Sequence, residues 1–118
     1  MKRLRIEENN TIYGELDKFT MLGNFHEYDG KINYARVDVG VLGETRTGVN
    51  VSLQTDRFGE PNLEPEISWP SLGASSLEET ENFILSLKVA TKVAEQLRDL
   101  VEEYNEETPA DAGFKVEL

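Results

Sequence analysis

The chain has 118 residues, enough for one domain, and its 23 acidic and 12 basic residues give a formal net charge of −11. Such an excess of carboxylates disfavours binding to nucleic acid or to anionic membrane surfaces, and fits either solubility or attraction to a basic partner. The chain has no cysteine and no apolar run of about 20 residues, which excludes thiolate chemistry and a membrane-spanning helix. We therefore expect a cytoplasmic protein.

The N-terminal two-thirds of the chain alternates apolar and polar residues in the manner of β-strands. The weaker alternation over residues 12–16 predicts either an irregular edge strand or a loop. Asp29-Gly30 separates two clear strands and is a pair that readily forms a type I′ hairpin turn. The predicted strands cover about residues 2–7, 18–28, 31–42, 46–55 and 66–69.

The Asp29-Gly30 turn sets the register of the expected hairpin. Pairing across it places Phe25 opposite Tyr34. Further along the strands, Leu22 then faces Val37. A three-residue loop at residues 43–45 would place Val37 opposite Val51 and Val39 opposite Val49, keeping one face apolar. That face consists of Leu22, Val37, Val39, Val41, Val49, Val51 and Leu53.

A short fourth strand of the core precedes the helix. Ile67 and Trp69 share one face of it and are expected to join the apolar core. Pro70 ends this strand because proline cannot donate a hydrogen bond to a ladder. Residues 56–65 before it are expected to form a loop.

A long helix is predicted over about residues 76–106. Ser76 and Glu79 match the S-x-x-E capping box, and apolar residues follow at steps of three and four. These residues are Phe83, Leu87, Ala90, Ala94, Leu97, Val101 and Tyr104, widened by Ile84, Val89, Val93 and Leu100. A face this wide favours packing on a sheet. The expected fold is a single α+β domain, residues 1–107, with an antiparallel sheet of about four to five strands and one long C-terminal helix packed on one face.

The length of this helix predicts an overhang. About 30 helical residues span roughly 45 Å, more than the roughly 20–33 Å of the expected sheet. An overhanging stripe with Leu97, Val101 and Tyr104 would favour a homo-oligomer through the same helix of a second copy. The alternatives are that the helix frays before Tyr104 or that the N-terminal strand covers the excess.

The end of the helix is acidic, and its charges oppose the helix dipole there. Either this end frays, or its carboxylates serve a partner. Residues 108–118 form a tail in which Phe114, Val116 and Leu118 alternate. The tail is therefore expected either to add a late strand or to remain disordered.

The sequence contains no recognisable catalytic constellation. His26 is the only histidine, and no serine lies in a nucleophile motif. Without cysteine, a metal site would depend on carboxylates, and their spacing matches no calcium loop. We expect a non-enzymatic protein with no metal and no cofactor.

The second face of the sheet is expected to carry an aromatic patch, because one helix covers only one face. This patch is a candidate for an interaction site or for ligand contacts. Its predicted members are Phe19, Met21, Phe25, Tyr34 and Arg36, and Trp69 is grouped with them as a candidate ligand contact.

The first functional hypothesis is an acidic interaction module that forms a homo-oligomer and binds a protein partner. In its sharper form the helix imitates the charge of nucleic acid and inhibits a basic nucleic-acid-binding protein, as an accessory protein of a phage or mobile element would. It would not bind nucleic acid or a membrane itself. The residues that would carry it are Glu95, Asp99, Glu102, Glu103 and Glu106.

The alternative hypothesis is a small-molecule or nucleotide-binding protein, with a pocket between sheet and helix or between subunits. Trp69 and Tyr34 would stack on the ligand. Arg36, Arg46 or Arg57 would contact an anionic group.

Overall fold

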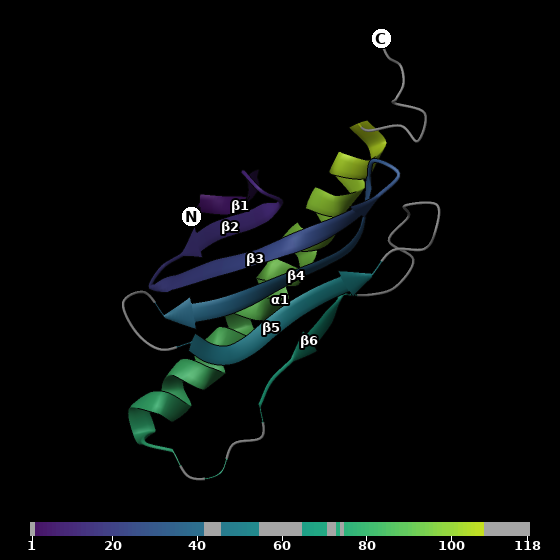
Figure 1. The fold of residues 1–118 in the computed structure, drawn as a ribbon. Coiled ribbons are helices and arrows are strands. Elements are labelled where there is room, and N and C mark those ends of the chain that lie inside the picture. The colour runs from purple at the N-terminus through teal and green to yellow at the C-terminus, as the bar shows by residue number, and fades with distance from the viewer. Residues whose placement is uncertain (1, 42–45, 55–64, 71–72, 74, 108–118) are drawn as a thin grey trace.

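A computed structural model of the protein describes residues 2–41, 46–54, 65–70, 73 and 75–107. Six strands form one antiparallel sheet in which each strand pairs with its neighbour in the chain, and one helix crosses a single face of it (Figure 1). This α+β architecture is the predicted one. The elements are β1 (Lys2–Glu7), β2 (Thr11–Leu16), β3 (Phe19–Tyr28), β4 (Lys31–Val41), β5 (Arg46–Gln54), β6 (Glu66–Ser68) and α1 (Leu77–Glu107).

Tight turns with left-handed residues connect the first four strands. Asp29 and Gly30 have φ of 56° and 80°, as the predicted type I′ turn requires. Asn9 and Asn10 have φ of 59° and 57°, so a second turn of this kind joins β1 to β2. The weakly alternating segment is strand β2, which pairs with β1 on one side and with β3 on the other. Of the two alternatives, strand or loop, the strand is therefore the correct one.

The register between β3 and β4 differs from the prediction. Tyr28 pairs with Lys31, but a bulge follows, and Phe25 then pairs with Ala35 rather than with Tyr34. The bulge inserts Asn33 as an extra residue in β4. A one-residue shift reverses the faces, so Leu22 lies opposite Asp38 and is 45% exposed. The prediction that Leu22 joins the apolar face is wrong.

The register between β4 and β5 is partly as predicted. Val37 pairs with Val51, but a bulge near Gly48 (φ 86°) interrupts the ladder before Val49 reaches Val39. The hydroxyl of Thr47 donates to the Val39 carbonyl at 3.0 Å and compensates for the interruption. The predicted loop at residues 43–45 lies outside the described residues, as do most of the predicted loop 56–65 and the tail at residues 108–118.

Helix α1 begins at the predicted capping box. The backbone N–H of Ser76 donates to the Glu79 carboxylate at 2.9 Å, and the Glu79 N–H donates to the Ser76 hydroxyl at 3.1 Å. Beyond it, one stripe of the helix packs on the sheet. Its buried residues are Ser86, Val89, Ala90, Val93, Leu97, Val101 and Asn105. The valines predicted for the apolar face of β4 and β5 are buried beneath this stripe.

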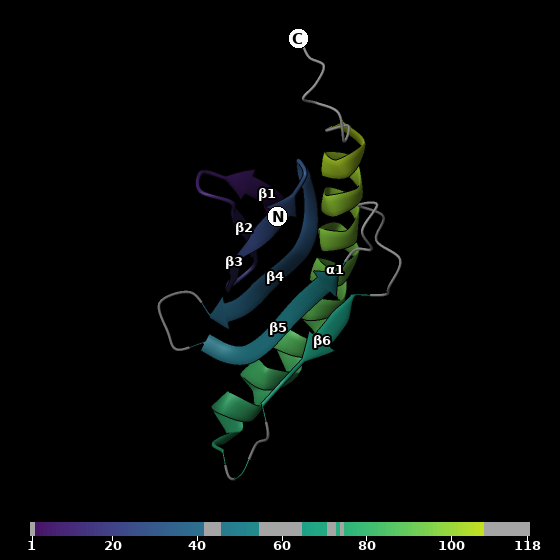
Figure 2. The ribbon, with the colours of Figure 1, turned by 45° about the vertical axis from the view of Figure 1, so that its right-hand side comes forward.

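The helix does overhang the sheet, but at the end opposite to the predicted one. The first turns of α1 project past the strands in both views (Figures 1 and 2). Leu77, Ile84 and Leu85 are exposed there. The second half of the helix is contacted by β1, where the Leu4 N–H donates to Gln96 Oε1 at 3.1 Å, and by the β3–β4 hairpin, where Lys31 Nζ donates to the Asn105 carbonyl. The expected alternative that the N-terminal strand covers part of the helix is therefore confirmed.

Candidate functional site

The outward face of α1 carries the carboxylates that the sequence singled out. Glu95, Asp99, Glu103 and Glu106 are exposed, and Glu102 is half-buried. We call these five residues the acidic row. Glu95, Asp99, Glu103 and Glu106 follow one another at helical steps of three and four on the side opposite the buried stripe, and Glu102 lies beside them. Arg98 lies beside the row, and its Nε is 3.2 Å from the Glu102 carboxylate.

The acidic row occupies the end of the helix where negative charge is least favourable. The last turn of α1 contains no basic residue, whereas Glu78 and Glu79 lie at the first turn, where the dipole favours them. Local helix stability therefore accounts for the carboxylates at the N-terminus but not for those at the C-terminus.

Two of the three residues predicted for self-association are buried, and the third, Tyr104, is half-buried. Leu97 and Val101 have no exposed surface, because both pack against the sheet. The Tyr104 hydroxyl donates a hydrogen bond to Glu27, and its ring lies 5.6 Å from that of Phe25. Assigning Leu97 and Val101 to a surface between copies was wrong, because the sheet buries both within one chain.

The predicted aromatic patch is divided between the two faces. Phe19, Met21 and Phe25 are at most 4% exposed and form the core beneath α1, so their assignment to the second face was wrong. The cause is again the register shift at Asn33. Trp69 lies beyond the end of β6 and is 60% exposed, so its predicted place in the core with Ile67 was also wrong.

The uncovered face of the sheet carries only part of the predicted patch. Tyr34 and Arg36 do lie on this face, where Tyr34 stacks on His26 with a centroid distance of 6.2 Å. Arg36 is 3.5 Å from the Asp38 carboxylate. Arg57 and the side chain of Arg46 are outside the described residues. Of the groups predicted to stack on a ligand or to contact its anionic group, Tyr34 and Arg36 share this face.

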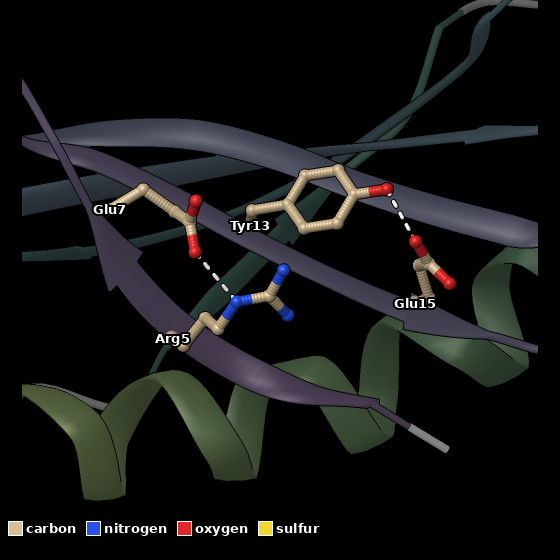
Figure 3. Close-up of polar contacts among 4 residues, drawn as sticks. All are labelled: Arg5, Glu7, Tyr13 and Glu15. Carbon is tan, nitrogen blue, oxygen red and sulfur yellow. Dashed lines mark hydrogen bonds and ion pairs between the residues drawn. The ribbon is translucent and has the colours of Figure 1, made fainter.

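Four side chains of the β1–β2 hairpin form a compact polar cluster on the same uncovered face (Figure 3). The Arg5 guanidinium contacts Glu7 at 2.6 Å and lies 5.0 Å from the centre of the Tyr13 ring. The Tyr13 hydroxyl donates to Glu15 at 2.6 Å, and this hydrogen bond raises the pKa of Tyr13 above its ordinary value. Each charged group has a partner within the cluster, since Arg5 pairs with Glu7 and Glu15 accepts from Tyr13, which suits a surface that stabilises the hairpin.

A groove between the β2–β3 turn and the first half of α1 is lined by lysines and apolar side chains, and the sequence did not predict it as a site. Its volume is about 370 Å³. Its lining residues are Leu16, Asp17, Lys18, Phe19, Leu85, Lys88, Val89 and Lys92. We call it the lysine groove. A signal for it exists in the spacing of Lys88 and Lys92, one helical turn apart on a helix in which Arg98 is the one other basic residue.

Within the part of the chain that the structure describes, no group of three or more His, Asp or Glu side chains is placed to hold a metal ion. No helix among those residues is both long and apolar enough to cross a membrane. No protein-family model, curated protein or solved structure matches the chain.

Proposed function

We propose that the protein is a non-enzymatic interaction module that binds a basic protein through the acidic row and competes there with nucleic acid. The observation that carries this proposal is the position of the row. Its carboxylates project from the exposed face of a rigid helix, at the end where they oppose the helix dipole. A charged surface that works against local stability is more readily explained by a partner than by folding.

The spacing of the row supports mimicry of a phosphate strand. From Glu95 to Glu106 the helix advances about 16 Å, which corresponds to about one carboxylate per 4 Å of axis. A single DNA strand carries one phosphate per about 3.4 Å. Arg98 offsets one of these charges through Glu102, and the remaining four still form a dense line that a basic groove could accept.

A basic partner fits this surface better than a second copy of the chain. Two acidic rows packed against each other would repel, and the two apolar side chains that a helix pair would have used are buried. The expected homo-oligomer is therefore not part of the proposed function.

The experiment is a pull-down from nuclease-treated host lysate with three baits. They are the unaltered protein, the triple variant Asp99→Asn/Glu103→Gln/Glu106→Gln, and a control triple variant Glu8→Gln/Glu66→Gln/Glu81→Gln. Both variants lose the same charge, but the control retains the acidic row. Glu102 is left unchanged because it pairs with Arg98.

We expect a basic nucleic-acid-binding protein on the unaltered and control baits, released by salt and displaced by added duplex DNA. The acidic-row variant should retain much less of it. Equal capture by all three baits, or capture that duplex DNA does not displace, would rule out the acidic row as a mimic of nucleic acid.

A further inference from the structure

The lysine groove concentrates positive charge on a strongly acidic molecule. Lys18, Lys88 and Lys92 line it, which is half of the six lysines in a chain of net charge −11. Asp17 is the acidic residue of the lining, so positive charge is in excess there. Lysines that line one groove favour the binding of an anion there, which offsets their positive charge.

The floor of the groove is apolar. Phe19 and Val89 form it, and both are almost fully buried in the core beneath. Leu85 is 39% exposed at the helix side, and Leu16 lies at the opposite wall. Apolar surface that faces water is covered favourably by an apolar ligand.

Lys18 is held at the rim by two contacts. Its Nζ donates to the Asn82 side-chain oxygen at 2.7 Å and lies 5.8 Å from the centre of the Phe19 ring. An ammonium has three donors, so the hydrogen bond to Asn82 leaves capacity for an anionic group of a ligand. The positively charged rim is thus fixed next to the apolar floor.

We infer that the lysine groove binds a small amphiphilic anion, with its apolar body over Phe19 and Val89 and its carboxylate or phosphate between Lys88 and Lys92. A neutral apolar ligand would leave the lysines without a counter-charge. A small inorganic anion would leave the floor exposed to water. The volume of about 370 Å³ lies at the lower end of the range for ligand pockets, which suits a single short chain or one ring system.

This site is separate from the acidic row, and either can exist without the other. The lysines lie on the first half of α1, whereas the acidic row begins at Glu95. Lys92 is one helical turn from Glu95, so the tests use Lys88 and Lys92 for the groove and Asp99, Glu103 and Glu106 for the row, and leave Glu95 unchanged.

The test is an NMR titration of the isotope-labelled protein with decanoate, kept below its micelle concentration. Parallel titrations use decanol and inorganic phosphate. We expect saturable amide shifts at residues 16–19 and 82–92, with an apparent Kd of about 1 mM or tighter, as for other small ligands. Decanol and phosphate should each bind at least about tenfold more weakly, because decanol lacks the anionic group and phosphate lacks the apolar chain.

Two variants test whether the lysines and Leu85 of the groove bind the ligand. Lys88→Gln/Lys92→Gln should weaken decanoate binding about tenfold or more, and Leu85→Gln should weaken decanoate and decanol alike. The matched control is Arg5→Gln/Arg36→Gln, which removes the same charge from the uncovered face and should bind decanoate as the unaltered protein does.

Three results would overturn the inference. The first is shifts that fail to saturate or that spread evenly over the chain. The second is equal binding of decanoate by the Lys88→Gln/Lys92→Gln variant and the unaltered protein. The third is binding to phosphatidylglycerol vesicles without binding to free decanoate, which would assign the lysines to a lipid surface.

Discussion

The side-chain amide of Asn105 is hydrogen-bonded twice to the backbone of Ile32. Asn105 Oδ1 accepts from the Ile32 N–H at 2.8 Å, and Asn105 Nδ2 donates to the Ile32 carbonyl at 3.2 Å. The described part of β5 pairs with β4 only as far as Tyr34. At Ile32, the helix therefore provides the pair of hydrogen bonds that a neighbouring strand would provide elsewhere.

Replacing Asn105 should therefore destabilise the fold. Asn105→Ala leaves a buried N–H and a buried carbonyl without these hydrogen bonds, which should cost about 2–4 kcal/mol of unfolding free energy. Asn24→Ala, an exposed position of β3, is the control and should change stability by less than about 0.5 kcal/mol. Urea denaturation measures both. A cost below about 0.5 kcal/mol for Asn105→Ala would show that the two hydrogen bonds contribute little.

Tyr104 should titrate at unusually high pH. Its partial burial, and then the hydrogen bond and negative charge of Glu27, raise its pKa to about 12 from 10.0. A raised pKa in the folded state means that the stabilisation is complete below pH 10 and is lost as the pH rises from 10 to 12. Ultraviolet titration of the protein and of Tyr104→Phe, by difference, gives the midpoint of this residue. A midpoint near 10 would contradict the buried contact with Glu27.

Gly23 should tolerate no side chain. A Cβ there would lie 1.8 Å from the Arg36 carbonyl oxygen and 2.6 Å from the Val37 Cα, both backbone atoms of β4. Gly23→Ala should therefore force the β3–β4 pairing apart, at a cost of about 3 kcal/mol or more. Gly14→Ala is the matched control: its nearest neighbour, at 2.9 Å, is the flexible end of Leu4, so it should cost less. Equal losses in thermal denaturation would argue against the close approach at Gly23.

The sequence predicted the elements well because its signals are local. The Asp29-Gly30 turn, the Ser76–Glu79 capping box and the helical stripe each depend on residues close in the chain. The faces of β3 could not be predicted, because they depend on one extra residue, Asn33, whose bulge carries no distinctive composition. The predicted patch followed from that missed bulge, whereas the self-association residues were predicted from the length of the helix relative to the sheet.

Of the two candidate sites, one could be predicted from local spacing and the other depends on the tertiary fold. The acidic row lies where it was predicted, since helical periodicity alone places it on the outward face. The lysine groove joins residues 16–19 to residues 85–92, and this contact depends on where α1 crosses the sheet. Helical spacing could suggest Lys88 and Lys92 as a pair, but not Lys18 as their neighbour.

The capping box should contribute measurably to stability. Ser76→Ala should lower the free energy of unfolding by about 1 kcal/mol, whereas Ser75→Ala should have a smaller effect. Hydrogen bonds from Ser76, the backbone one first, lower the pKa of Glu79. The contribution of Glu79 is therefore present above its unfolded pKa and is lost as the pH falls through its folded pKa. An unchanged difference between the unaltered protein and Glu79→Gln under acid conditions would contradict this.

Neutralising the end of the acidic row should stabilise the protein. Glu103→Gln and Glu106→Gln each remove a negative charge near the C-terminus of α1, and each should raise the free energy of unfolding by about 0.3–1 kcal/mol at low ionic strength. Glu78→Gln removes the same charge at the first turn and should have the opposite effect. Denaturation at low and high salt checks both signs, since screening should shrink both differences. If Glu103→Gln and Glu106→Gln lowered stability instead, these carboxylates would have a structural role and the case for a partner would weaken. If both substitutions raise stability while partner capture falls, the acidic row destabilises the fold but is needed for binding.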